Sequence, residues 1–113
     1  MPEMIDGYNY DWTNSENMVL CGASSYVQKY YFNEKFKLLP DEIKNELKIM
    51  CVSFAEEAGG ILTMEFDKFG NLSFCVRVDD ADFYFDEIES GLKISLYQRK
   101  KEELLSQLEL FYK

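Results

Sequence analysis

Histidine is absent from this chain of 113 residues, and its absence narrows the chemistry more than any motif does. Without an imidazole there is no Ser-His or Cys-His nucleophile pair and no histidine-ligated zinc or iron site. No remaining side chain has an ordinary pKa near neutrality. Any catalysis would depend on carboxylates, lysine, tyrosine, cysteine or a bound metal. No catalytic constellation is recognisable, so we expect a protein that is not an enzyme.

Cysteine is scarce, and its three residues fit neither a disulfide framework nor a CxxC metal site. Cys21, Cys51 and Cys75 are odd in number, lie 30 and 24 residues apart, and have apolar neighbours. We therefore expect reduced, buried thiols that serve as packing atoms. Cys21 is followed by glycine, alanine and two serines, but no base lies near it in the sequence. Packing is favoured over a nucleophilic role.

Basic residues are few: 12 lysines and arginines stand against 21 acids, for a net charge of −9. Such a charge repels phosphate backbones and anionic lipid surfaces, so we expect no nucleic-acid partner. No apolar run approaches the roughly 18 residues of a membrane span, and no secretory-signal pattern opens the chain. We expect a cytoplasmic protein that does not enter a membrane and carries no cofactor.

Core material is plentiful, with 47% hydrophobic and 16% aromatic residues, enough for one folded domain. Residues 1–17 differ from the rest, since they hold four acids, no base and several turn formers. They predict a flexible acidic arm, followed by a single domain at 18–113. Tyr8, Tyr10 and Trp12 alternate within the arm. We favour their packing on the protein's own surface or staying mobile over docking on a partner.

The central stretch, residues 59–78, predicts a β-hairpin with strands at 61–66 and 72–78. Asp67 to Asn71 has the residues of a type I turn closed by Gly70. If Asp67 faces Asn71, one face of the hairpin is apolar and the other is mixed. The pairs on the apolar face are then Phe66 with Leu72, Met64 with Phe74, and Leu62 with Val76.

Two segments before the hairpin complete the predicted core. Residues 18–32 have strand composition with a bend at 22–25, and form either one bent strand or two short ones. Residues 41–58 predict a helix whose apolar stripe packs on the hairpin. The stripe comprises Ile43, Leu47, Met50, Phe54 and Ala58, widened by Cys51 and Ala55. Ile49 and Val52 fall on the other side. If the first strand, the helix and the hairpin form a split βαβ unit, a right-handed crossover would place the first strand beside residues 72–78.

Residues 79–89 hold six acids and no base. The run lacks the glycine and terminal glutamate of a calcium loop, and acids are expected at the start of a helix. Helix capping is therefore favoured over metal binding, and we assign no metal ligand. From about 83 to 112 the pattern predicts one long helix or a helix broken near Gly91.

A seven-residue alternation in the C-terminal helix marks a second apolar seam. A continuous helix of this length would span about 45 Å, longer than such a domain is across. Either two helices fold back, or the last turns project and pair with another subunit, and folding back is slightly favoured. The residues that would bind a partner are Ile94, Tyr97, Leu104, Leu108 and Phe111 of the seam, with Tyr30 and Tyr31 of the aromatic segment.

Five short stretches are similar to a family of small uncharacterised proteins from anaerobic Gram-positive bacteria. They are VLCGA (19–23), KYYFN (29–33), LKIMC (47–51), GGIL (59–62) and SGLKI (90–94). The resemblance covers about residues 18–112. It implies a compact bacterial cytosolic domain and assigns no functional residue.

The predicted fold is α+β: a small antiparallel sheet built on the central hairpin and an N-terminal strand or hairpin, packed by two helical segments. The function favoured by the surplus of apolar and aromatic positions is a non-enzymatic protein-interaction module, with a homodimer among the alternatives. A small-molecule or metal-binding domain is the second hypothesis, with a pocket between the central hairpin and the Tyr30/Tyr31 segment or a cation on residues 79–89. An enzyme using Cys21 or carboxylates is the third.

Overall fold

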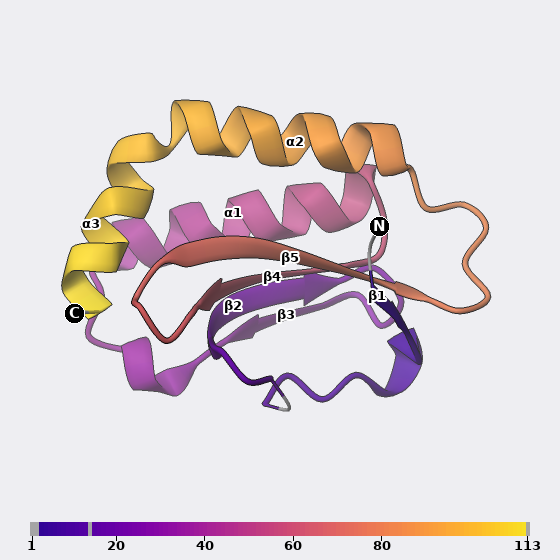
Figure 1. Cartoon of the computed structure of the whole chain (residues 1–113), viewed down its shortest axis with the longest axis horizontal. Coiled ribbons are helices and arrows are strands. Elements are labelled where there is room, and N and C mark those ends of the chain that lie inside the picture. The colour runs from indigo at the N-terminus through magenta and orange to yellow at the C-terminus, as the bar shows by residue number, and fades with distance from the viewer. Residues whose placement is uncertain (1–2, 14, 113) are drawn as a thin grey trace.

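The computed structural model describes residues 3–13 and 15–112 and has the predicted α+β architecture (Figure 1). Its mixed sheet has five strands in the order β1-β5-β4-β2-β3. The elements are β1 (Glu3–Ile5), 3-10 helix η1 (Gly7–Asn9), β2 (Met18–Ser24), β3 (Lys29–Phe32), 3-10 helix η2 (Glu34–Phe36), α1 (Asp41–Glu57), β4 (Ile61–Phe66), β5 (Leu72–Asp79), α2 (Glu87–Lys100) and α3 (Glu102–Tyr112). The α-helices cover one face of the sheet, here called the inner face, and N-terminal residues cross the opposite, outer face (Figure 1).

The β4–β5 hairpin has the register that the sequence predicted. The three apolar pairs are Phe66 with Leu72, Met64 with Phe74, and Leu62 with Val76. The Asp67 N–H donates to the Asn71 carbonyl at 2.9 Å. The Asp67 carboxylate accepts the N–H groups of Phe69 and Asn71 at 2.8 and 3.0 Å. Gly70 has a φ of +84°, which glycine adopts without strain. Turn and pattern therefore agree on one register.

Residues 18–32, for which the sequence left two alternatives, form two strands. The bend predicted at 22–25 was placed too early, because β2 continues through Ser24 and the chain turns at residues 25–28. Gly22 pairs with Thr63 of β4 on one side and Tyr31 of β3 on the other. A bend at Gly22 would interrupt both ladders.

The strand order differs from the expected one. β2 lies between β3 and β4 and is antiparallel to both, so β3 and β4 run parallel with α1 between them in the chain. The expectation that the first strand lies beside residues 72–78 was wrong. Because residues 18–32 form a hairpin, β3 leads into α1 and β2 fills the space between β3 and β4. The place beside β5 belongs to β1, which pairs parallel with Arg77 to Asp79.

The N-terminal residues are not the loose arm that the sequence predicted. Glu3 pairs with Arg77 in the β1–β5 ladder, η1 follows, and the chain then crosses the outer face to reach β2. We call residues 3–13 and 15–17 the N-terminal strap. β1 could not be predicted from sequence pattern, because it has three residues and its partner strand lies more than seventy positions away.

Helix α1 buries the predicted stripe against the inner face. Its buried residues are Leu47, Met50, Cys51, Phe54 and Ala55. They form one cluster with Leu62, Met64 and Phe66 of β4. Of the two apolar residues predicted on the other side, Val52 packs against this cluster and Ile49 is exposed. Each large side chain that is fully buried contributes about 1.5–3 kcal/mol, so this contact is the centre of the core.

The C-terminal helical region breaks at Lys101, not at Gly91. Helix α2 begins at Glu87 and passes through Gly91, where an added Cβ would have no atom within 4 Å. Lys101 leaves the helical conformation, and its ammonium pairs with Glu46 of α1 at 2.6 Å. A straight helix over all 26 residues from 87 to 112 would be about 39 Å long, beyond the longest dimension of 37 Å. The break turns α3 down across the end of the sheet (Figure 1).

Candidate functional site

The predicted partner-binding seam of the C-terminal region does not form one exposed surface. Tyr97 and Leu108 are 7% and 1% exposed and belong to the core of this chain. Ile94 and Leu104 pack against the same core, and only Phe111 of the set is exposed. The Tyr97 hydroxyl donates to the Met50 carbonyl at 3.0 Å. The break at residue 101 therefore directs the seam inward.

The other two predicted residues, Tyr30 and Tyr31, lie on opposite faces of β3. Tyr30 packs against the core on the inner face. Its hydroxyl is buried without a hydrogen-bond partner among the described residues, and burial raises its pKa. Tyr31 stacks on the Trp12 ring on the outer face, with ring centroids 5.3 Å apart and planes 7° apart. The two tyrosines thus belong to separate sites.

A groove of about 850 Å³ opens between the β2–β3 hairpin and α1. Its lining includes Ala23, Ser24, Tyr30, Lys48, Val52 and Glu56. The groove combines apolar walls with two lysines, one glutamate and hydroxyl groups. The groove includes Tyr30 but is lined by no residue of β4 or β5, so it is not the pocket expected between the central hairpin and the Tyr30/Tyr31 segment.

The cysteines are reduced, and two of them are in contact. Cys21 and Cys51 are fully buried with sulfur atoms 3.8 Å apart, and Cys21 also contacts the Met64 sulfur at 3.7 Å. The hydrogen bond with Cys21 and burial raise the pKa of the Cys51 thiol well above its usual value. A thiol held neutral in an apolar core is a packing group and a poor nucleophile.

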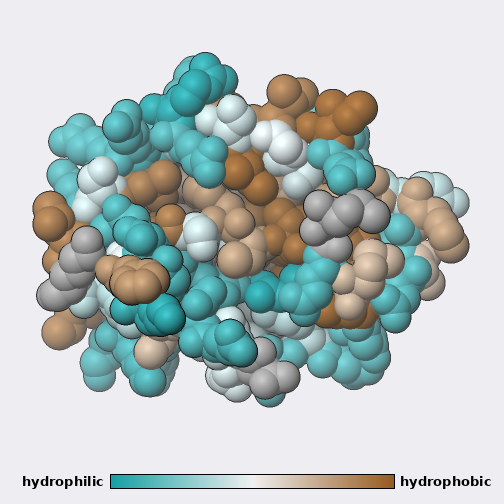
Figure 2. All heavy atoms as spheres, viewed as in Figure 1, coloured by the Kyte–Doolittle hydropathy of each residue, from teal (hydrophilic) through white to brown (hydrophobic). Residues whose placement is uncertain are grey.

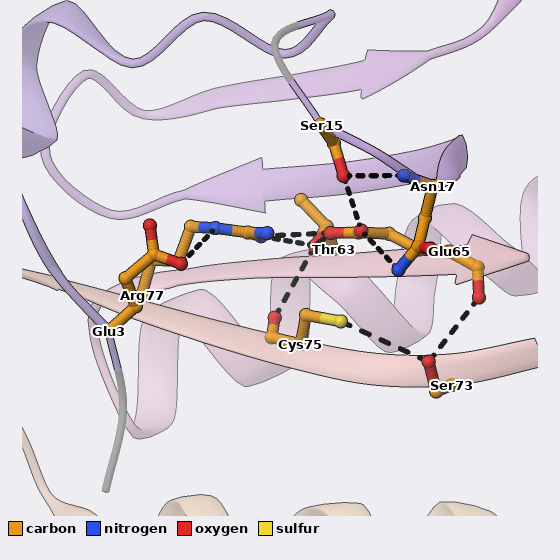
Figure 3. Close-up of polar contacts among 8 residues, drawn as sticks. All are labelled: Glu3, Ser15, Asn17, Thr63, Glu65, Ser73, Cys75 and Arg77. Carbon is orange, nitrogen blue, oxygen red and sulfur yellow. Dashed lines mark hydrogen bonds and ion pairs between the residues drawn. The ribbon is translucent and has the colours of Figure 1, made fainter. Parts of the chain in front are cut away.

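The strap and the outer face meet in a polar cluster centred on Glu65 of β4 (Figure 3). The Glu65 side chain is 1% exposed. One carboxylate oxygen accepts the Ser15 hydroxyl at 2.8 Å and lies 3.4 Å from the Asn17 amide nitrogen. The other accepts the Thr63 hydroxyl and, at 2.9 Å, Nη1 of Arg77. Two strap residues and two sheet residues thus hold one buried carboxylate.

Arg77 of β5 supplies the positive charge of this cluster. Its Nη1 also donates to the Thr63 hydroxyl at 2.8 Å, and its Nε lies 3.6 Å from a carboxylate oxygen of Glu3. Its guanidinium lies over the Tyr10 ring, 5.4 Å from the centroid, within the range of a cation–π interaction. Arg77 therefore connects the start and the middle of the strap to the outer face.

The cluster favours the charged forms of both partners. Burial opposes ionisation of Glu65, but the hydrogen bonds from Thr63, Ser15 and Arg77 outweigh it, and the pKa of Glu65 is lowered. Burial likewise opposes the charge on Arg77, and the hydrogen bond to Glu65 outweighs it, so the pKa of Arg77 is raised. Removing either partner of such a buried ion pair would leave the other charge buried and unpaired, which strongly destabilises a folded protein.

An aromatic stack attaches the middle of the strap. Trp12 lies flat on Tyr31, and Tyr10 meets the Trp12 ring edge-on at a centroid distance of 5.1 Å. Gly22 makes the close approach of the indole possible, because an added Cβ would stand 2.6 Å from the Trp12 ring. The alternating aromatics of residues 8–12 are visible in the sequence. The surface on which Trp12 packs is not, because Gly22 of β2 and Tyr31 of β3 form it.

Two clefts of about 400 and 500 Å³ remain between the strap and the sheet. The larger is bordered by Glu3, Asp6, Tyr10, Glu16, Cys75 and Arg77. The Tyr10 hydroxyl is buried with no partner among the described residues, and burial raises its pKa. Cys75 is half-buried beneath the strap, and burial raises its thiol pKa as well.

Several acids of residues 79–89 have structural partners. Asp79 accepts the Gly7 N–H at 2.7 Å, and Asp82 accepts the Tyr26 hydroxyl at 2.7 Å. The Asp86 carboxylate caps α2. Across residues 3–13 and 15–112, no group of three or more cysteine, aspartate or glutamate side chains is placed to hold a metal ion.

Four large, exposed apolar side chains lie where the chain enters α2. Phe83 and Tyr84 are 89% and 96% exposed, and Ile88 and Leu92 on the first turns of α2 are 78% and 61% exposed. We call these four residues the aromatic–aliphatic surface. Figure 2 shows apolar and hydrophilic residues intermixed at this end of the molecule.

Fold and site together define a small α+β domain of one mixed sheet, helices on its inner face and a strap on its outer face. The chain belongs to a family of unknown function, DUF6145, whose sequence model matches residues 17–113. Membership in an uncharacterised family agrees with the resemblance noted from the sequence; its bacterial origin stays a prediction. No curated protein and no solved structure matches this chain. No helix within the described residues is long and apolar enough to cross a membrane.

Proposed function

We propose that this protein is a cytoplasmic, non-enzymatic interaction module that binds a protein partner through the aromatic–aliphatic surface. The observation that carries the proposal is the exposure of Phe83 and Tyr84, at 89% and 96%. Large apolar residues exposed singly are ordinary, but four of them within ten positions of the chain are a feature that binding sites often have. Aromatic anchors dominate the binding energy of many interfaces.

The backbone around the two aromatics is fixed by hydrogen bonds, which supports a binding role. The Tyr84 N–H donates to the Asp82 carboxylate at 2.9 Å, and the same carboxylate accepts the Tyr26 hydroxyl. At the other end of the loop, the Asp86 N–H donates to the Ala58 carbonyl at 3.0 Å. Anchors presented on an ordered loop lose less conformational entropy on binding.

The charges around the surface indicate the chemistry of the partner. Asp80, Asp86 and Glu87 are exposed beside the aromatics, and the whole chain carries a net charge of −9. Complementary charges on the two sides of an interface speed association and exclude wrong partners. We therefore expect a partner with an apolar groove and a basic rim. A second copy of this acidic chain fits that description less well.

A photo-crosslinking residue placed at Tyr84 tests the proposal in cells that make the protein. The matched control carries the same residue at Phe69, which is 71% exposed at the tip of the β4–β5 turn. We expect one discrete adduct from position 84 and none from position 69. The mass of the adduct separates a foreign partner from a homodimer of this chain.

Two further substitutions test whether the crosslink depends on the aromatic–aliphatic surface. Ile88→Ser and Leu92→Ser change exposed positions, so each should alter stability by no more than about 0.5 kcal/mol. Both should remove the adduct at position 84. Equal labelling at 84 and 69, or an adduct that survives both substitutions, would show that the surface is not a specific binding site.

A small-molecule site is the second candidate function, supported by the groove beside Tyr30. A volume of about 850 Å³ is within the usual range for ligand pockets. The buried Tyr30 hydroxyl without a partner is a further observation in its favour. Native mass spectrometry of the purified protein tests it, since a retained ligand would appear as a reproducible added mass.

A further inference from the structure

The outer face of the central hairpin carries several polar side chains beside Ile61 and Cys75, and the strap covers it. Thr63, Glu65, Ser73 and Arg77 point to this face and alternate with the apolar residues of the inner face. Antiparallel sheets with one polar face usually present that face to water. Yet Thr63 and Glu65 are fully buried here. A permanent cover would be expected to rest on apolar side chains.

The strap is also separate from the main core. The core cluster begins at Leu20 and contains no residue of the strap. Strap contacts include a three-residue ladder to β5, the aromatic stack on Tyr31, and hydrogen bonds to Asp79 and Glu65. Glu3 and Tyr10 also contact Arg77, and the Tyr8 ring packs on Tyr26. The part of the chain that matches the family model starts at residue 17, so almost the whole strap lies outside it. The fold of the sheet and helices does not depend on the strap for its apolar packing.

We propose that the outer face is a docking site for an extended peptide segment, which the protein's own strap occupies reversibly in cis. The strap defines the chemistry of the segment. An aromatic ring lies on Tyr31 over Gly22, and a hydroxyl and an amide three and five positions later reach Glu65. The partner is therefore an extended segment with an aromatic residue followed by small polar residues. Its docking surface is distinct from the aromatic–aliphatic surface.

The electrostatics of the polar cluster suit such an exchange. When the strap leaves, Glu65 and Arg77 keep their mutual ion pair and Thr63 keeps its bond to both. Water then replaces the donors of Ser15 and Asn17. Because no charge is left buried and unpaired in the open state, opening avoids the large penalty of breaking a buried pair.

The sequence contains two built-in reporters of strap docking. Trp12 is the only tryptophan of the chain, so its fluorescence reports the strap alone. Cys75 borders the larger cleft under the strap, whereas Cys21 and Cys51 are fully buried in the core. Alkylation of Cys75 therefore reports opening of the strap, and alkylation of the other two cysteines reports unfolding of the domain.

The test uses the full-length Trp12→Ala chain and a synthetic peptide with the sequence of residues 3–17. A segment attached in cis has an effective concentration in the millimolar range, so the ring is removed from the cis strap to let a peptide compete. The variant contains no tryptophan, and the peptide supplies the only indole signal. We expect a saturable rise in the fluorescence anisotropy of the peptide and several-fold slower alkylation of Cys75 at saturation.

The control peptide carries Ser15→Ala and Asn17→Ala, which remove the two donors to Glu65, and should bind several-fold more weakly. Alkylation of Cys75 should also be several-fold faster in the Trp12→Ala chain than in the wild type, with Cys21 and Cys51 unchanged. If the Trp12→Ala chain loses its circular dichroism, Trp12→Phe serves instead, since it also lacks tryptophan.

Three results would overturn the docking site. They are an anisotropy that stays constant up to millimolar peptide, equal binding of the control peptide, and alkylation of all three cysteines at one common rate. The last result would mean that the strap opens only when the whole domain unfolds.

Discussion

Replacing Leu108 by alanine tests whether the C-terminal apolar pattern stabilises one chain or joins two. Leu108 lies in α3, is 1% exposed, and belongs to the same cluster as Phe66 of the central hairpin. Truncation of a buried leucine to alanine costs about 2–5 kcal/mol, because apolar contacts are lost and a cavity remains. Domains of this size have a free energy of unfolding of about 5–15 kcal/mol. The variant should therefore fold and be markedly less stable.

Urea unfolding followed by circular dichroism measures this effect. The free energy of unfolding of small proteins falls by about 1–3 kcal/mol per molar urea, so a loss of about 3 kcal/mol lowers the midpoint by about 1–3 M. Leu110→Ala is the matched control, because Leu110 lies on the same helix and is 74% exposed. The control should change the free energy of unfolding by no more than about 0.5 kcal/mol.

The same experiment at several protein concentrations separates the two interpretations. If Leu108 is a core residue, the midpoints of wild type and variant do not depend on concentration. If the wild-type midpoint rises with concentration and Leu108→Ala abolishes that rise, Leu108 is at a subunit interface. That result, or equal small effects of Leu108→Ala and Leu110→Ala, would refute the assignment to the core.

Three further predictions follow from individual residues. Gly70→Ala should destabilise the protein by about 1–2 kcal/mol, because Gly70 has a φ of +84° in the turn. Gly91→Ala should instead stabilise it by about 0.5–1 kcal/mol, because Gly91 lies in an exposed helix interior. Thermal melts compare the two variants, and stability changes of equal sign would contradict the backbone argument. Glu65 has a lowered pKa in the folded protein, so the stability from its ionisation is present above its ordinary value of 4.5 and is lost as the pH falls through its folded pKa. Wild type should accordingly lose more stability between pH 6 and 3 than Glu65→Gln, and parallel pH profiles of the two proteins would disprove the role of Glu65. Asp86→Ala should lower the free energy of unfolding by about 0.5–2 kcal/mol, because the Asp86 carboxylate accepts the Glu89 N–H at 2.9 Å at the start of α2. An unchanged urea midpoint would show that this cap does not stabilise the protein.

The candidate sites were only partly visible in the sequence, and the reason differs between them. Phe83 and Tyr84 are plainly aromatic, but their exposure depends on a loop held by Asp82 and Tyr26, which lie 56 positions apart. The polar cluster joins Ser15 to Glu65 across 50 positions. Neither periodicity nor turn chemistry encodes such distant pairs, because both describe neighbours along the chain.

The sequence by itself determined the local elements of this protein. The hairpin register was predictable because the turn at 67–71 and the alternation of apolar residues specify the same pairing. The extent of α1 was predictable because its stripe recurs with the helical period and ends at two glycines. These signals lie within a few residues of the positions they describe.

Only the tertiary structure decided the strand order, the break at Lys101 and the docking of the strap. At the break, the Lys101 ammonium pairs with Glu46 of α1, 55 positions away in the chain. β1 looked like part of a loose arm, and a free ladder position beside β5 made it a strand. Each outcome depends on a partner distant in the sequence, and such partners meet only when the whole chain has folded.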